Sequence, residues 1–233
     1  GYATKKVMEE KDGIPGSKIS VVHIGVPENM FKFSESGRQK LRSEFGLDGE
    51  QIVIGAVSRL VEFKGHLFLM KAFKELTEKF NNVKLLIVGD GPLGDSLKTE
   101  AANLGISNQI IFAGHRNDLS DILSSMDIFT QTSIDFGGES FPIAMLDAMS
   151  VGLPLLASDV GDLKYMVEKN NGFLIEHKNI SQITEFLKIL IESKDIREDF
   201  GNESRKIFLE KFTIQRMIDR IESLYLNELG RRG

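Results

Sequence analysis

Short apolar runs alternate with amphipathic segments along most of this chain, and that alternation limits the folds open to it. The runs are rich in β-branched residues and are typical of buried strands. They span residues 19–26, 51–58, 83–89, 109–114, 127–133, 153–158 and 172–175. Strands that are apolar on both faces and separated by helices predict a parallel sheet with right-handed crossovers. We therefore predict an α/β fold, a Rossmann-like doubly wound parallel sheet.

Helical patterns fill the intervals between these runs. KGHLFLMKAFKELTEKF (64–80) repeats apolar residues at i, i+3 and i+4, and further helices are predicted over 96–105 and 117–126. From residue 180 onward the pattern is helical, so extra C-terminal helices are expected outside the sheet. The first residues, GYATKKVMEEKDG, read like the middle of a helix in a longer protein. We see no Pro/Gly/Ser-rich linker and no internal repeat.

Composition excludes several kinds of site. The net charge of −5 argues against a broad nucleic-acid footprint. The absence of cysteine excludes disulfides and thiolate metal sites, and the four histidines are too widely spaced for a helical metal pair. The sequence contains no run of about 18 apolar residues, so no membrane span is predicted. The N-terminus lacks the apolar core of a signal peptide. A cytoplasmic location is expected.

The loop SRLVEFKG (58–65) carries two cations where a predicted strand ends. In doubly wound sheets ligands bind beyond the carboxyl ends of the strands. The guanidinium of Arg59 and the ammonium of Lys64 would suit a diphosphate. A solvated surface pair is the alternative interpretation.

The stretch GDGPLG (89–94) has the form of a dinucleotide-binding signature. It follows the third predicted strand rather than the first, and the next strand does not end in an acidic residue. Pro92 also removes a backbone donor. A tight turn that borders a ligand is therefore favoured, and a dinucleotide-dependent oxidoreductase stays an alternative.

SIDFGGES (133–140) leads into a predicted helix. Gly137 and Gly138 permit a close backbone approach, and Pro142 fits a first helical turn. The free N–H groups of Ile143 and Ala144 would then form an anion site at the helix start. Loop flexibility alone is the alternative.

Glu139 and Asp147 flank the mostly apolar stretch ESFPIAMLD. Eight residues of helix advance about 12 Å and rotate about 80°, whereas hydrolytic carboxylate pairs stand about 5–9.5 Å apart. We therefore predict that the two acids hold two parts of one elongated polar ligand. Alternatively, Glu139 stabilises the helix dipole and Asp147 lies near solvent.

Six stretches in this order resemble the C-terminal, nucleotide-sugar-binding domain of retaining GT-B glycosyltransferases (the group 1 family), over about residues 17 to 228. They are VVHIGVPENMF, SRLVEFKG, LLIVGDGP, IIFAGH, MDIFTQTS and ESFPIAMLDAMSVGLPLLASDVGD. The resemblance implies the C-terminal half of a GT-B fold. Residues 1–16 would end the interdomain region, 17–212 would bind the donor, and 213–233 would form a helix packing towards an N-terminal domain.

The resemblance also implies roles for single residues. Arg59 and Lys64 would bind the donor diphosphate and Glu139 the transferred sugar, as the catalytic set. Asp147 stands where the family usually has a glutamate that grips the ribose, which shortens the reach. The tail SDVGDLKYMV departs from the family pattern around Asp162. The implied donor-binding residues are Gly89, Gly91, Pro92, His115, Arg116, Ser140, Phe141, Ile143, Ala144 and Asp147.

The activity implied is retaining transfer of a sugar from a nucleotide diphosphate sugar to an acceptor hydroxyl, in polysaccharide, lipopolysaccharide or glycolipid synthesis. No metal and no cofactor would be needed, and a UDP-sugar is favoured over a GDP- or ADP-sugar. The acceptor glycan or glycolipid would bind through the N-terminal domain, so this chain alone is expected to be inactive. Peripheral association with the inner face of the membrane is open. A non-catalytic nucleotide-binding subunit, an epimerase and a phosphorylase are the alternatives.

Overall fold

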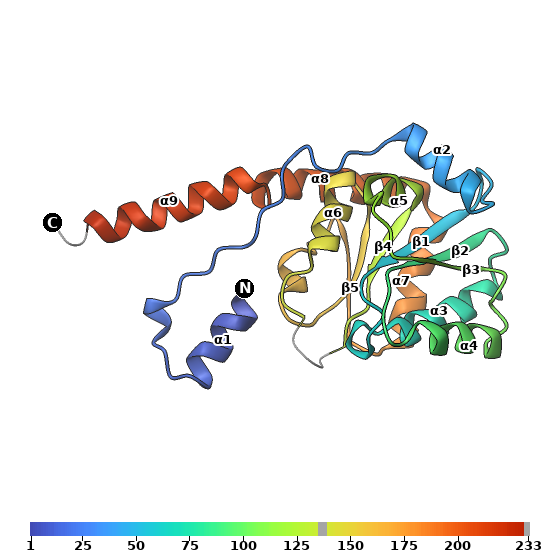
Figure 1. Ribbon diagram of the computed structural model, residues 1–233, viewed down its shortest axis with the longest axis horizontal. Helices are drawn as coiled ribbons and strands as arrows, with labels where there is room; N and C mark the ends of the chain where they lie inside the picture. Colours follow the sequence, from blue (N-terminus) through green and yellow to red (C-terminus); the bar gives the residue numbers. More distant parts are fainter. Residues whose placement is uncertain (135–138, 231–233) are drawn as a thin grey trace.

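A central parallel sheet organises the fold. The computed structural model describes residues 1–134 and 139–230, and Figure 1 shows the sheet between helical layers. Its order is β3-β2-β1-β4-β5-β6, which confirms the predicted doubly wound α/β fold. The strands are β1 (Ile52–Val57), β2 (Val83–Val88), β3 (Ile110–Gly114), β4 (Ile128–Gln131), β5 (Leu155–Ser158) and β6 (Gly172–Ile175).

Helices cover both faces of the sheet. α3 (His66–Thr77), α4 (Gly94–Asn103) and α7 (Ile180–Glu192) pack on one face, and α2 (Glu35–Glu44), α5 (Leu119–Ser125), α6 (Ile143–Val151) and α8 (Lys194–Lys211) on the other. Successive strand side chains point to opposite faces, so the neighbours Ile128 and Phe129 belong to different apolar clusters. α7 and α8 are thus part of the two layers, and α9 (Ile214–Gly230) is the C-terminal helix outside them.

The prediction of a first strand over residues 19–26 is wrong. This segment is extended but forms only one bridge, between Val26 and Thr213. Val26 N donates to the carbonyl of Phe212 over 3.0 Å, so its neighbour is the α8–α9 junction rather than the sheet. The apolar pattern of the segment is used for packing at the edge of the domain, where His23 stacks on Phe141 with ring centroids 4.5 Å apart.

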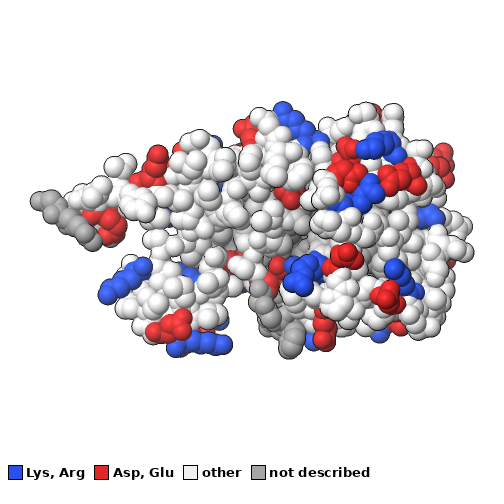
Figure 2. Space-filling view, viewed as in Figure 1, with Lys and Arg blue, Asp and Glu red and all other residues white. Residues whose placement is uncertain are grey.

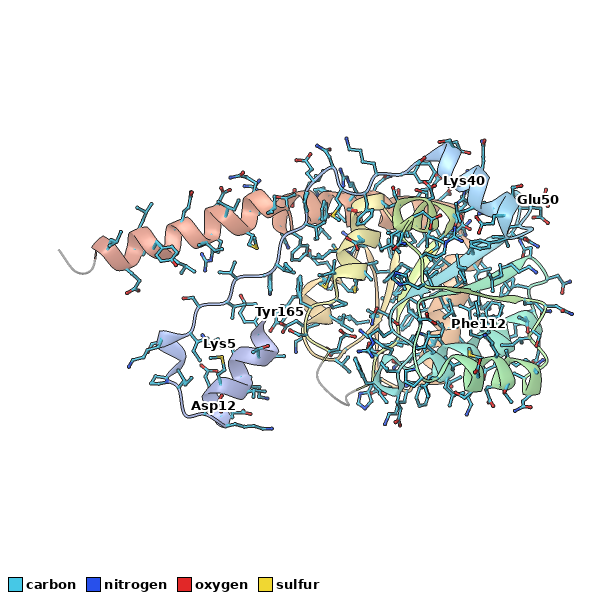
Figure 3. The ribbon with its side chains drawn as sticks, in the orientation of Figure 1. Lys5, Asp12, Lys40, Glu50, Phe112 and Tyr165 are labelled. Carbon is cyan, nitrogen blue, oxygen red and sulfur yellow. The ribbon has the colours of Figure 1, made fainter. Side chains whose placement is uncertain are left out.

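Two helices lie beyond the sheet, where Figure 1 places both chain ends. α1 (Tyr2–Glu10) approaches the domain near Tyr165, which Figure 3 labels beside it, and the Tyr2 and Tyr165 rings are 4.6 Å apart. α9 has no buried residue. The division into 1–16, 17–212 and 213–233 stays a prediction.

Two further features concern the distribution of charge on the surface and the apolar character of the helices. On the face drawn in Figure 2, Lys and Arg are interspersed with Asp and Glu instead of gathering in one basic patch. Within residues 1–134 and 139–230, no helix combines the length and the apolar character that crossing a membrane requires.

Glycines let the loops at the carboxyl ends of the strands press against one another. A Cβ at Gly65, whose φ is +69°, would overlap the carbonyl oxygen of Thr132. A Cβ at Gly161, with φ +55°, would overlap the carbonyl oxygen of Glu139. Side chains rarely adopt these torsions and none would fit the space. The loops after β1, β4 and β5 therefore form one closely packed rim.

We expect Gly65→Ala to lower the free energy of unfolding by about 3 kcal/mol, because the left-handed torsion and the overlap with Thr132 act together. Gly105→Ala is the matched control, since Gly105 has φ +71° but no atom within 4 Å of its Cβ position. The control should lose about 1 kcal/mol. Urea unfolding measures both, and equal losses would contradict the proposed loop contact.

Candidate functional site

Lys64 and Glu139 meet at the point where the strand order of the sheet reverses. β1 and β4 are neighbours in the sheet, and the loops after them flank the crevice in which doubly wound folds bind ligands. Lys64, in the turn Glu62–Lys64 after β1, places its Nζ 2.5 Å from Glu139 Oε2 in the loop after β4. Their side chains are only 13% and 7% exposed. The two residues form a nearly buried ion pair.

Two further polar groups hold the Glu139 carboxylate. Ser133 Oγ donates to Oε2 over 2.6 Å and Gln131 Nε2 donates to the same oxygen over 3.0 Å. Oε1 accepts no hydrogen bond from any residue that the structure describes. Sequence reasoning missed Ser133 and Gln131. Their signal was an amide and a hydroxyl at the carboxyl end of a buried strand.

Glu139 does not lie on a helix. α6 begins at Ile143 and Pro142 is its N-cap, so the separation calculated for a continuous helix from Glu139 to Asp147 is wrong. Pro142 has an extended ψ of 123° and sets the start of the helix. Gly137 and Gly138, singled out in the sequence, lie outside the described residues.

The start of α6 offers backbone donors. Ile143 and Ala144 donate no backbone hydrogen bond to another described residue, as expected for the first N–H groups of a helix; Phe141, directly before the N-cap, donates none either. Ile143 is 51% exposed. The backbone of Ser140 is held by the loop after β5, because its carbonyl accepts a hydrogen bond from Asp162 N over 3.1 Å. An anion could therefore reach these N–H groups.

Asp147 is a buried acid in α6. It is 5% exposed, and its Oδ1 has no hydrogen-bond partner among the described residues. Burial raises the pKa of Asp147 to about 7. Buried polar atoms without partners are uncommon and call for an explanation, and the missing partner makes Asp147 a candidate ligand contact.

Arg59, Gly89, His115 and Arg116 line one cavity of about 330 Å³ beside the β1 and β2 loops. Arg59 and His115 are exposed. Arg116 instead donates to Asp118 Oδ2 over 2.6 Å and to Glu44 Oε1 over 2.7 Å. These hydrogen bonds, led by Asp118, raise the pKa of Arg116, and its guanidinium is thereby tied to the protein.

The GDGPLG stretch forms a tight turn against the basic loop. Leu60 N donates to the carbonyl of Asp90 over 2.9 Å, and Leu93 N donates to the carbonyl of Leu60 over 3.0 Å. A Cβ at Gly91 would lie 2.5 Å from the carbonyl oxygen of Leu60. Gly91 and Pro92 therefore border the basic loop rather than open a separate cofactor site.

His66 was not anticipated from the sequence. It is 3% exposed at the start of α3, and its Nε2 lies 3.0 Å from Ser58 Oγ. Burial, and then the charge of Lys64, lower its pKa to about 4. A neutral His66 thus ties α3 to the start of the loop that carries Arg59 and Lys64. Its position directly after Gly65 was the available signal.

The rim combines two kinds of recognition group. Lys64, Arg59 and the first N–H groups of α6 would attract an anion, whereas Glu139 and Asp147 would accept hydrogen bonds from hydroxyls. A ligand with a charged centre and polyhydroxyl ends fits this arrangement. In the described part of the chain, no three His, Asp or Glu side chains are grouped so as to hold a metal ion.

Comparison with known proteins points to one family. The family described as "Glycosyl transferases group 1" matches residues 37–207. The chain is 29% identical over 218 residues to the Escherichia coli UDP-Gal:alpha-D-GlcNAc-diphosphoundecaprenol alpha-1,3-galactosyltransferase, covering 90% of this chain and 54% of that protein. This chain thus spans about half the length of the curated relatives it matches.

Solved structures share the fold. Anabaena HepE, crystallised with UDP and glucose, superposes with a TM-score of 0.86 at 24% identity, over 96% of this chain and 61% of that one. The C-terminal domain of the group 1 protein LpcC from Francisella tularensis has a TM-score of 0.72 at 24% identity, over 82% of this chain and all (100%) of that one. The fold is therefore that of the C-terminal part of GT-B glycosyltransferases.

Proposed function

Because the chain belongs to the glycosyl transferases group 1 family, we propose that this site binds the donor, a nucleotide diphosphate sugar. The whole protein would transfer the sugar to an acceptor hydroxyl with retention of configuration. The observation that carries this proposal is the meeting of Lys64 and Glu139 beside the start of α6.

The diphosphate would lie between Lys64, Arg59 and the N–H groups of Ile143 and Ala144. Charge develops on the leaving diphosphate as the bond to the sugar breaks, and donors fixed in advance stabilise that charge. In this proposal neither a metal ion nor an organic cofactor would be required. Since Lys64 and Glu139 are paired in the free site, donor binding would exchange partners: the ammonium would turn to the phosphate.

Glu139 would then accept hydrogen bonds from the transferred sugar. Ser133 and Gln131 already donate to this carboxylate and would hold it in place when Lys64 moves. Ser140 and Phe141 would contribute backbone groups next to the same sugar. Asp147, buried in α6 without a partner for Oδ1, would accept from the ribose hydroxyls.

The base would occupy the cavity of about 330 Å³ that Gly89, His115 and Arg116 line; Gly91 and Pro92 directly follow Asp90, another residue of its lining. Since Arg116 is committed to Asp118 and Glu44, the base would be held mainly by backbone groups. We propose UDP-sugar ahead of GDP- or ADP-sugar. HepE, which was crystallised with UDP, and the E. coli relative, which is named for UDP-Gal, support this choice.

The acceptor is proposed to be a glycan or glycolipid in polysaccharide, lipopolysaccharide or glycolipid synthesis. The E. coli relative is named for a lipid-linked sugar acceptor, which supports this class. Residues 17–212 would supply the donor half of the site. An N-terminal domain, reached through residues 1–16 and 213–233, would supply the acceptor half. The protein would work in the cytoplasm, at the inner face of the membrane when the acceptor is lipid-linked.

Titration calorimetry with UDP, GDP and ADP tests the proposal. We expect UDP to bind, and Arg59→Ala to weaken its affinity about tenfold, because one exposed cation leaves the phosphate. Arg220→Ala, on the exposed helix α9, is the control and should leave the affinity unchanged. Absence of binding at about millimolar nucleotide, or an unchanged Kd in Arg59→Ala, would count against the proposal.

A further inference from the structure

A second polar cavity, of about 610 Å³, opens at the opposite end of the strands from Lys64 and Glu139. Its lining includes Asp127, directly before β4, and Pro154, directly before β5. These residues mark the amino-terminal edge of the sheet, whereas the proposed donor site lies beyond the carboxyl ends. The function proposed above does not use this cavity.

Three guanidinium groups line the cavity. Arg197 and Arg205 come from α8, and Gly201 lies midway between them, so all three residues share one face of that helix. Arg38 reaches the cavity from α2. A Cβ at Gly201 would overlap the carbonyl oxygen of Gly152, so α8 packs closely against the end of α6 and brings its arginines to the cavity.

Each guanidinium donates to backbone carbonyl oxygens, Arg38 and Arg197 through Nη1 and Arg205 through both Nη1 and Nη2. Arg197 Nη1 donates to the carbonyl of Leu190 over 2.6 Å, and Arg205 Nη1 donates to the carbonyl of Ser150 over 2.7 Å. Arg197 Nε and Nη2 donate to no residue in the described ranges. The hydrogen bonds from Nη1 therefore orient the Arg197 guanidinium and leave Nε and Nη2 available to a ligand.

Carboxylates do not balance this positive charge. Asp127 is shared, because Arg38 lies 2.6 Å from its Oδ1 and Arg42 3.3 Å from its Oδ2. The other acid of the cavity, Glu198, pairs with Lys194 at 3.2 Å. Neither Arg197 nor Arg205 forms an ion pair with a described residue.

Arg197 is held in surroundings that disfavour its charge. Burial lowers its pKa, and the charge of Arg38 lowers it further, while Asp127 and Glu198 raise it. The helix-terminal carbonyls that Arg197 caps compensate in part through the negative end of the helix dipole. A bound anion would stabilise the guanidinium directly.

We propose that this cavity binds a phosphate-bearing ligand, with the phosphate between Arg38, Arg197 and Arg205. Planar guanidinium forks match phosphate oxygens in geometry and charge. Phe33, Leu153 and Pro154 add apolar wall to the same cavity, which would contact the organic part of a phosphomonoester. The phosphate could belong to a soluble metabolite or to a lipid headgroup, since both present the same chemistry.

Inorganic phosphate, titrated at constant ionic strength against chloride and followed by two-dimensional ¹H–¹⁵N NMR, tests this site. We expect the amide signals of Gly152 and Gly201 and the Nε–H signal of Arg197 to move. Arg197→Gln should weaken phosphate binding there about tenfold, because the fork with free donors is lost. Arg220→Gln carries the same charge change on exposed α9 and should bind like wild type.

Arg205→Gln is the second variant, because Arg197 also caps α7 and its replacement could unfold the chain. It should weaken the same signal changes if the phosphate lies where we propose. Two results would overturn the proposal: shifts confined to Lys64, Ile143 and Ala144 at the donor site, or equal phosphate affinity in wild type, Arg197→Gln and Arg205→Gln. Neither result depends on nucleotide binding, so the two proposals fail separately.

The source of the phosphate is distinguished with glycerol 3-phosphate and with phosphatidylcholine vesicles that contain or lack phosphatidic acid. Binding of glycerol 3-phosphate that depends on Arg197, with no vesicle binding, supports a soluble ligand. Sedimentation with phosphatidic acid vesicles that Arg197→Gln abolishes supports a headgroup. Failure of both probes to bind in an Arg197-dependent way contradicts the site.

Discussion

Lys64→Ala is expected to abolish measurable nucleotide binding and to lower the free energy of unfolding by about 3 kcal/mol. Glu139 would stay buried in the loop after β4 with Ser133 and Gln131 as donors but without its cation. A buried charge that loses its partner is strongly destabilising. Urea unfolding measures the free energy of unfolding, and titration calorimetry measures the affinity for UDP.

Two controls separate stability from recognition. Lys211→Ala breaks the exposed pair with Glu168, whose side chains are 49% and 45% exposed, and should cost less than about 1 kcal/mol. The double variant Lys64→Met/Glu139→Gln removes both buried charges, so it should regain most of the stability and still fail to bind UDP. Wild-type UDP affinity in Lys64→Ala would remove Lys64 from the donor site.

Asp147→Asn is expected to stabilise the free protein at about pH 8 by about 4 kcal/mol. Burial raises the pKa of Asp147 to about 7, above the value of about 3.9 in an unfolded chain. Between these values the folded state holds a proton that the unfolded state has released. The stability that this protonated acid contributes is complete below about pH 4 and is lost as the pH rises through about 7.

Asparagine does not ionise, so the advantage of Asp147→Asn should grow as the pH rises from about 4 to about 8. Thermal unfolding across that range measures it. The same variant should bind UDP about tenfold more weakly, because the ribose hydroxyls lose a charged acceptor. Asp147→Glu, the longer acid, should keep UDP binding. A gain in stability that does not vary with pH, or unchanged UDP affinity in Asp147→Asn, would contradict this account of Asp147.

Periodicity predicted the sheet because buried parallel strands leave a strong local signal of short β-branched apolar runs. Every predicted strand after the first is present in the sheet. The run 19–26 has the same composition, yet a strand needs a neighbour to pair with. Val26 finds only Thr213, and no local pattern shows which partner a segment will meet.

The positions of the loops at the candidate site could be predicted from the sequence, but the contacts between them could not. Parallel strands end at one edge of a sheet, so the loops that carry Arg59, Lys64 and Glu139 could be placed together. The ion pair joins Lys64 to Glu139 because β1 lies beside β4, and chain order does not specify that neighbour. The Ser58–His66 contact likewise depends on how α3 packs on the β1 loop.

A crystal structure with UDP bound is the most direct test of the proposed donor site. We expect the diphosphate against Lys64, Arg59 and the N–H groups of Ile143 and Ala144, with the ribose hydroxyls about 2.5–3.0 Å from the carboxylate of Asp147. We also expect Lys64 Nζ to leave Glu139 for a phosphate oxygen. A diphosphate bound elsewhere, with the Lys64–Glu139 pair intact, would contradict it.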